Sequence, residues 1–188
     1  MRMSEKASKE MPAAEKKEEK NCYDEKNYRI LGVDPGLNKT GYAIIEASSR
    51  KLNAVNCLEL GVIRTSSKDE IQKRLAKIYS EIGSIIQEFK PSIAAIEKVF
   101  ININPESSIS LCFARGACLT AFGSLQIKTV EYSPNSIKKT VTGFGLADKK
   151  QVTRTIMVEL GTRSNIPADS ADAAAVALCH LYRSKQNM

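Results

Sequence analysis

Four acidic residues lie where apolar segments end or begin, which is where a carboxylate can be held beside a buried surface. Asp34 closes one apolar stretch, and Glu97 closes a second, more apolar one. Asp169 and Asp172 are three positions apart near the start of an alanine-rich segment, so they share one face if that segment is a helix. The four carboxylates meet if the two stretches are neighbouring strands and the helix packs over them.

Four like charges in one cleft repel each other and are costly to remove from water. Divalent cations would relieve that cost. A set of oxygen ligands without histidine or cysteine suits Mg²⁺ or Mn²⁺ rather than zinc. On a basic domain, such a cleft predicts cleavage of a phosphodiester by two metal ions, one activating the attacking water and one stabilising the leaving oxygen.

Each acid also has a purely structural interpretation. Asp34 precedes a Pro-Gly pair and could simply initiate a turn. Glu97 could be a solvated strand end, or could pair with a nearby cation. Asp169 could cap a helix, and Asp172 could complement the helix dipole. The prediction therefore depends on the combination of the four acids and not on any one of them.

The charge of the chain indicates an anionic partner. The 188 residues include 28 Lys+Arg and 21 Asp+Glu, a net charge of +7. Residues 1–27 carry seven charges of each sign, so the whole excess lies on 28–188. Five cations and one acid lie within 138–154, a density that suits contacts to phosphates. Phe144 is the one aromatic residue there, so no base-stacking platform is predicted.

The composition also limits the class of protein. Residues 1–27 are predicted to be a disordered charged leader, and 28–188 one domain with a real core. No apolar run approaches the roughly 20 residues of a membrane span, and no signal core is present, so a cytoplasmic location is expected. The cysteines have no CxxC spacing, and Cys57, Cys112 and Cys179 are interpreted as reduced core thiols. His180, the only histidine, leaves little material for a zinc site or a serine-protease triad.

The elements that must position these residues follow from apolar patterning and turn residues. Three strands joined by short turns are best paired antiparallel, and the remaining order of strands and helices gives an α/β domain with a mixed sheet. The pattern predicts strands over 28–34, 40–46, 56–64, 93–96 and 127–131, and helices over 69–89, 105–123, 134–141, 149–160 and 169–183.

Four segments together resemble the RuvC family of bacterial Holliday-junction resolvases, within the ribonuclease H-like superfamily. They are GVDPGLNKTG (32–41), AIEKVF (95–100), LCFARG (111–116) and PADSADAAAVALCH (167–180). The resemblance covers about residues 29–182 and implies a mixed five-stranded sheet flanked by helices. It also implies a homodimer that binds a four-way DNA junction and nicks two strands of like polarity, using two Mg²⁺ or Mn²⁺ ions in each active site. RuvA and RuvB are the partners that it implies.

The resemblance also implies roles for single residues. The four acids match the catalytic and metal-binding carboxylates of the family: Asp34, Glu97, Asp169 and Asp172. Phe100 matches an aromatic residue that stacks on bases near the junction centre; otherwise it is a core or loop anchor. Lys138 and Lys149 match basic residues near the scissile phosphate; otherwise they are part of a solvated face. Arg115 either contacts DNA or neutralises acids, and the sequence does not choose.

Three other functions share features with this sequence. The Gly-x-Asp-x-Gly hairpin also occurs in sugar kinases and actin-like ATPases, but those need a second, similar lobe, and the chain has no repeat. A nuclease of the YqgF type, which processes ribosomal RNA precursors, is the closer rival. A catalytically inactive junction-binding module is the third, although a pure binder gains nothing from carboxylates that face phosphates.

Overall fold

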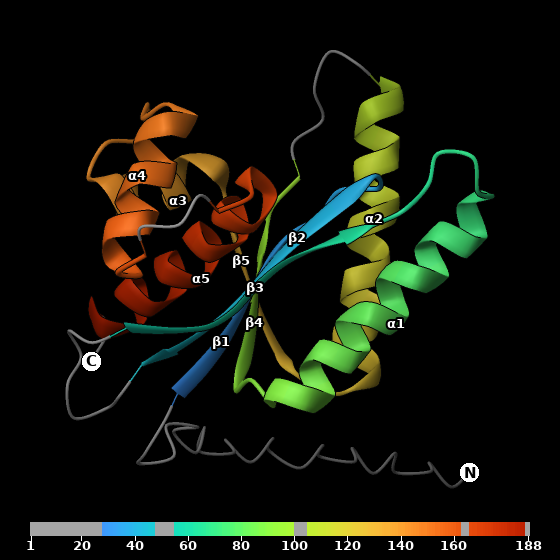
Figure 1. The fold of residues 1–188 in the computed structure, drawn as a ribbon, viewed down its shortest axis with the longest axis horizontal. Helices are drawn as coiled ribbons and strands as arrows, with labels where there is room; N and C mark the ends of the chain where they lie inside the picture. Colours follow the sequence, from blue (N-terminus) through green and yellow to red (C-terminus); the bar gives the residue numbers. More distant parts are fainter. Residues whose placement is uncertain (1–27, 48–54, 100–104, 163–165, 187–188) are drawn as a thin grey trace, which may run out of the picture.

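The computed structural model describes residues 28–47, 55–99, 105–162 and 166–186. The predicted leader and Phe100 lie outside these residues. A sheet of five strands separates two layers of helices (Figure 1). Along the chain the elements are β1 (Tyr28–Asp34), β2 (Lys39–Ala47), β3 (Val55–Arg64), α1 (Ile71–Phe89), β4 (Ile93–Glu97), α2 (Pro105–Ser124), β5 (Lys128–Tyr132), α3 (Pro134–Thr142), α4 (Lys149–Glu159) and α5 (Ala168–Gln186).

The sheet is mixed, with the strand order β3-β2-β1-β4-β5. β1 pairs antiparallel with β2, and β2 with β3, whereas β4 is parallel to both β1 and β5. The predicted fold, with its first three strands antiparallel, is confirmed. Val33 lies opposite Ile96 in the β1–β4 pair, so the next residues, Asp34 and Glu97, end neighbouring strands at the same edge of the sheet.

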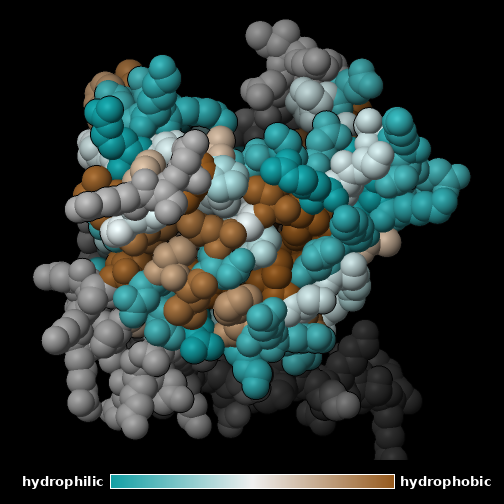
Figure 2. All heavy atoms as spheres, viewed as in Figure 1, coloured by the Kyte–Doolittle hydropathy of each residue, from teal (hydrophilic) through white to brown (hydrophobic). Residues whose placement is uncertain are grey.

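Each face of the sheet has its own core, because side chains alternate along a strand. Leu31 and Val33 of β1 face α1 and α2, and Ile30 faces the layer formed by α3, α4 and α5. Ile78 and Ile82 of α1 are completely buried, and each such burial contributes about 2 kcal/mol. Figure 2 shows hydrophilic side chains over α1 and much of α4, with hydrophobic side chains between them.

α5 approaches the sheet very closely because glycines stand beneath it. A Cβ atom on Gly32 would lie 2.1 Å from the carbonyl oxygen of Ala173, and one on Gly41 would lie 1.9 Å from that of Asp169. Both distances are far below van der Waals contact, so no larger residue fits at either position without a shift of backbone. The start of α5, with its two aspartates, is thereby held against β1 and β2.

Two predicted details are corrected. α1 begins at Ile71 and not at residue 69, and it ends with Lys90 in the left-handed conformation. The core-thiol interpretation holds for Cys179, which is buried, but it is wrong for Cys112, which is exposed on α2, and Cys57 is only partly buried. Among the described helices, none has the length and apolar character needed to cross a membrane.

Candidate active site

Carboxylates from three elements face one cavity. Asp34 at the end of β1, Glu97 at the end of β4 and Asp172 on α5 line a cavity of about 280 Å³. Lys138 on α3 and Lys149 on α4 line the same cavity, so its walls carry both signs of charge. The structure therefore brings together three of the four predicted acids and both predicted lysines.

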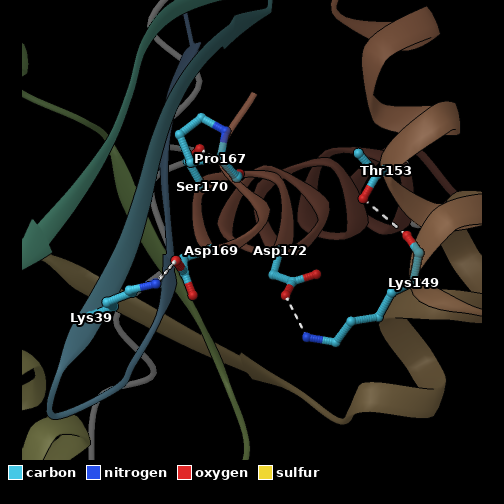
Figure 3. Close-up of polar contacts among 7 residues, drawn as sticks. All are labelled: Lys39, Lys149, Thr153, Pro167, Asp169, Ser170 and Asp172. Carbon is cyan, nitrogen blue, oxygen red and sulfur yellow. Dashed lines mark hydrogen bonds and ion pairs between the residues drawn. The ribbon is translucent and has the colours of Figure 1, made fainter. Parts of the chain in front are cut away.

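Asp169, the fourth acid, lies beside this cavity and lines a second one of about 650 Å³ next to the β1–β2 turn. Figure 3 shows that Asp169 and Asp172 lie on the same side of α5 and that each faces a lysine. The Nζ atom of Lys39 is 4.0 Å from Oδ2 of Asp169, and that of Lys149 is 3.2 Å from Oδ2 of Asp172. Sequence reasoning did not single out Lys39, although it begins β2 directly after the turn that follows Asp34.

Within the described ranges, no three acidic, histidine or cysteine side chains are gathered closely enough to hold a metal ion. Asp169 and Asp172 each direct a carboxylate oxygen to a lysine ammonium group and not to the other acids, which agrees with the separation of the carboxylates. The three acids of the smaller cavity thus share one space but do not form a ready-made ligand set.

The carboxylates nevertheless act strongly on one another. Burial and the charges of Glu97 and Asp172, against an opposing effect of Lys149, together raise the pKa of Asp34 to about 7. Burial and the charge of Asp172 likewise raise the pKa of Glu97, while Lys149 and Lys138 lower it. The cavity therefore holds more negative charge than its protein surroundings stabilise, which is the electrostatic property of a cation site.

The turn after Asp34 is fastened by a network that the sequence did not predict. Thr40 donates from its hydroxyl to the carbonyl oxygen of Gly36 at 2.8 Å. Thr65 donates to the carbonyl oxygen of Leu37, at 2.5 Å, and its backbone N–H donates to that of Asn38. Arg74 of α1 completes the network.

Arg74 joins two sides of the turn with one guanidinium group. Its Nε donates to the Thr65 hydroxyl at 2.9 Å, and its Nη2 donates to Oδ1 of Asn38 at 2.5 Å. These bonds connect α1 to the turn that directly follows Asp34. Position alone gave no signal for this role, because Arg74 is 40 residues away along the chain.

Arg115 is engaged with protein groups. Its Nη2 forms an ion pair of 2.6 Å with Glu131, and its Nε donates to the backbone oxygen of Glu97 at 3.4 Å. Of the two roles left open by the sequence, the structure favours neutralising an acid and anchoring the end of β4.

His180, interpreted from the sequence as needless for metal binding, is buried between two tyrosines. The hydroxyl of Tyr28 lies 2.8 Å from its Nε2, and that of Tyr132 lies 2.8 Å from its Nδ1. Burial and, to a lesser extent, the charge of Lys128 together lower the pKa of His180 to about 4. The imidazole thus links β1, β5 and α5 as a neutral group.

Comparison with known proteins identifies the family. A family model described as crossover junction endodeoxyribonuclease RuvC matches residues 30–180. The chain belongs to the RuvC family. The RuvC of Ehrlichia ruminantium (strain Welgevonden) is 43% identical over 156 residues, covering 83% of this chain and 98% of the relative. The RuvC of Rickettsia akari (strain Hartford) is 42% identical over 158 residues, covering 83% and 99%.

A solved structure agrees with this family assignment. The structure of Thermus thermophilus RuvC in complex with a Holliday junction substrate superimposes with a TM-score of 0.79 at 25% identity, covering 85% of this chain and 96% of that one. The yeast mitochondrial Holliday junction resolvase Ydc2, 14% identical with a TM-score of 0.63, shares the fold. The RuvC fold and the RuvC motifs thus coincide in one chain.

Proposed function

We propose that this RuvC-family chain is a structure-specific endodeoxyribonuclease that resolves four-way DNA junctions by paired, symmetric nicks. One observation carries the proposal: Asp34, Glu97 and Asp172, from three separate elements, line one cavity together with Lys138 and Lys149. Family membership over residues 30–180 supports the same activity. The combination suits a site where a phosphodiester is held between cations and carboxylates.

The metal assignment extends this proposal. The family is metal-dependent, and we propose two Mg²⁺ ions, replaceable by Mn²⁺, held by Asp34, Glu97, Asp169 and Asp172. The donor set fits, because it contains only carboxylate oxygens and because burial and the mutual repulsion of these groups raise the pKa values of Asp34 and Glu97. When bound, the ions supply an activated water and stabilise the leaving oxygen.

The chain's own residues bind and orient the substrate in this proposal. The charge of Asp172 raises the pKa of Lys149, so its ammonium group stays protonated beside the cavity. Lys149 and Lys138 can therefore neutralise the phosphate that enters between them. Phe100, proposed to stack on a base, follows β4 by three residues, outside the described ranges. Arg115 positions Glu97 by holding the backbone oxygen of that residue.

We propose a homodimer that associates through α2. Ile109 and Phe113, one helical turn apart, are 52% and 49% exposed, and Cys112 lies between them on the exposed side. Gly116 continues this face and has open space where a side chain would be. Two equivalent phosphates in a symmetric junction require two sites related by a two-fold axis, which an isologous contact of this face would provide.

We also propose protein partners and a cellular location for this chain. RuvA and RuvB are proposed as partners because the chain belongs to their companion family, and the cytoplasm is proposed as the compartment because the substrate would be cellular DNA. Residues 1–27 are proposed to add nothing to the chemistry, since the family match begins at residue 30. Deleting them should leave the cleavage rate unchanged, and a large loss of rate would contradict this.

The test offers three substrates of matched length: a four-way junction, a linear duplex and an RNA–DNA hybrid, each with and without Mg²⁺. Paired nicks in the junction alone, dependent on the ion, are expected. Cleavage of the hybrid or the duplex at a similar rate would favour another nuclease of the superfamily. Absence of cleavage of all three, with the junction still bound, would favour an inactive binding module.

A further inference from the structure

The loop between α3 and α4 exposes two large apolar side chains. Phe144 is 59% exposed and Leu146 is 80% exposed, although both lie in a domain that buries most of its large apolar residues. Ala147, which follows them, is 2% exposed and packs in the core under the helices. The loop thus has an anchored base and an apolar outer end, which we call the apolar tip (Phe144 and Leu146).

The tip is held in a defined shape. The Thr142 hydroxyl lies 2.8 Å from the carbonyl oxygen of Lys138 and 2.9 Å from that of Phe144, and it accepts the Phe144 N–H at 3.2 Å. The N–H of Ala147 donates to the carbonyl oxygen of Phe144. Gly143 ends α3 in the left-handed conformation with a φ of 77°, which a glycine adopts without strain. Apolar side chains that a hydrogen-bonded loop holds at the surface indicate an interaction site.

The surroundings of the tip indicate the chemistry of that partner. Lys138 and Lys139 precede the loop on α3, and Lys149 and Lys150 follow it on α4. The one acid between them, Asp148, is engaged as the N-cap of α4, where its side chain accepts the N–H of Gln151. Cations on both sides of an apolar end fit a polyanion that also offers flat apolar faces, and nucleic acid has both.

The tip is also close to the acidic cavity along the chain. Lys138 and Lys149 both line that cavity, and the loop that carries the tip joins their two helices. Thr142, the last residue of α3, is four positions from Lys138, or about 6 Å along the helix axis. This connection would allow a strand whose phosphate enters the cavity to present an adjoining base to the tip.

We propose that the apolar tip contacts the faces of DNA bases left unstacked at the branch of a junction, beside the phosphate bound by Lys138 and Lys149. The inference rests on the proposed function, because it takes the acidic cavity as the place of the scissile phosphate. Exposed apolar side chains among cations are used in this way by proteins that wedge between base steps. A lone phenylalanine in the sequence did not suggest this, because its exposure and the fastened loop are properties of the fold.

The test uses the absence of tryptophan from the chain. Phe144→Trp places a single indole at the tip, and Tyr79→Trp, on α1 at a position that is 40% exposed, is the matched control. Emission is measured with a chelator present so that no DNA is cut, while the anisotropy of labelled DNA reports binding separately. Saturating four-way junction should strongly quench the emission of Phe144→Trp, and a linear duplex should quench it much less. Tyr79→Trp should not respond.

A second pair of variants measures the contribution to binding. Phe144→Ala/Leu146→Ala should weaken junction binding by about tenfold and leave duplex binding within about twofold. Val158→Ala, which removes another exposed apolar side chain from α4, should leave both unchanged.

Three results would overturn the inference. The first is unchanged Phe144→Trp emission with bound junction, and the second is equal quenching by linear duplex. The third is quenching that follows protein concentration without DNA, which would show that a second copy covers the tip. If the unmodified chain binds the junction and quenching occurs but no nick forms with Mg²⁺, the proposed function fails and the contact stands.

Discussion

Asp34 is the residue at which the charges of the site converge. Its carboxylate is partly buried at the end of β1, and this burial raises its pKa together with the charges of Glu97, Asp172 and Asp169. The folded chain therefore binds a proton at Asp34 more readily than the unfolded chain does. The stability that this proton provides is present below about pH 4 and is lost as the pH rises through about 7.

Asp34→Asn should consequently stabilise the protein when no metal is added. At pH 8 with a chelator, the free energy of unfolding of the variant should be roughly 3 kcal/mol higher than that of the unmodified chain. The amide resembles the protonated acid and removes the repulsion between carboxylates. Urea titration measures this. The same variant should bind a junction and fail to cut it, and Mg²⁺ should no longer raise its melting temperature. Glu88→Gln, an exposed change of equal charge on α1, is the control. An unchanged or lower stability of Asp34→Asn would contradict the assigned electrostatics.

His180 contributes a pH dependence of the opposite sign. A neutral imidazole donates from one nitrogen and accepts at the other, so it can bond both Tyr28 and Tyr132. Because burial lowers its pKa to about 4, the unfolded chain takes up the proton first as the pH falls. The corresponding stability is complete above about pH 6.5 and is lost towards pH 4.

The stability of the unmodified chain should depend more steeply on acidic pH than that of the His180→Asn variant. Between pH 7 and pH 4.5, the free energy of unfolding of the unmodified chain should fall by roughly 2 kcal/mol more than that of His180→Asn, which has no imidazole to protonate. Denaturant unfolding at a series of pH values measures both slopes, and carboxylate contributions cancel in the comparison. Parallel slopes would show that the buried imidazole does not titrate as described.

At the scale of elements, the β1–β2 turn directly follows Asp34 and is held by hydrogen bonds from three sides. Thr40, Thr65 and Arg74 hold this turn from β2, the end of β3 and α1. Catalysis is sensitive to displacements of about 1 Å, so loosening the turn should slow cleavage without removing any group from the cavity.

Arg74→Ala should lower the single-turnover cleavage rate by roughly 10- to 100-fold, while junction affinity in a chelator stays within about threefold. Arg74→Lys should not restore the rate, because an ammonium group cannot reproduce the fixed fork that reaches both Thr65 and Asn38. Lys77→Ala, one helical turn along α1, is the control. Full activity of Arg74→Lys would show that charge alone matters at this position.

Elements are also the level at which the sequence was most informative. Apolar patterning and turn residues predicted every strand and helix described, and the parallel pairing of β1 with β4 makes Asp34 and Glu97 neighbours as expected. Pairings between side chains were not predictable, because Lys39–Asp169 and Arg74–Asn38 depend on distances that only packing determines. The exposure of Cys112 was mispredicted, because an apolar helix face does not reveal which neighbour covers it.

At the scale of the whole molecule, the proposed homodimer would bring two sites together through the exposed face of α2. Ile109→Asp/Phe113→Asp places charges in the proposed interface and should convert the dimer to a folded monomer, as measured by sedimentation velocity. On a supercoiled plasmid with an extruded cruciform, the unmodified dimer should give linear product, and the variant nicked circles. Tyr79→Asp, on exposed α1, is the control. A double variant that remains dimeric would place the interface elsewhere.

The proposed activity depends on divalent ions held jointly by carboxylates from β1, β4 and α5. Crystals of the full chain grown with Mn²⁺ test it directly, since anomalous scattering locates the metal. We expect anomalous peaks within about 2.5 Å of carboxylate oxygens of Asp34, Glu97 and the Asp169–Asp172 pair, with Lys149 displaced from Asp172. Saturating Mn²⁺ with no peak in this cavity, or with peaks only at other surface acids, would contradict it.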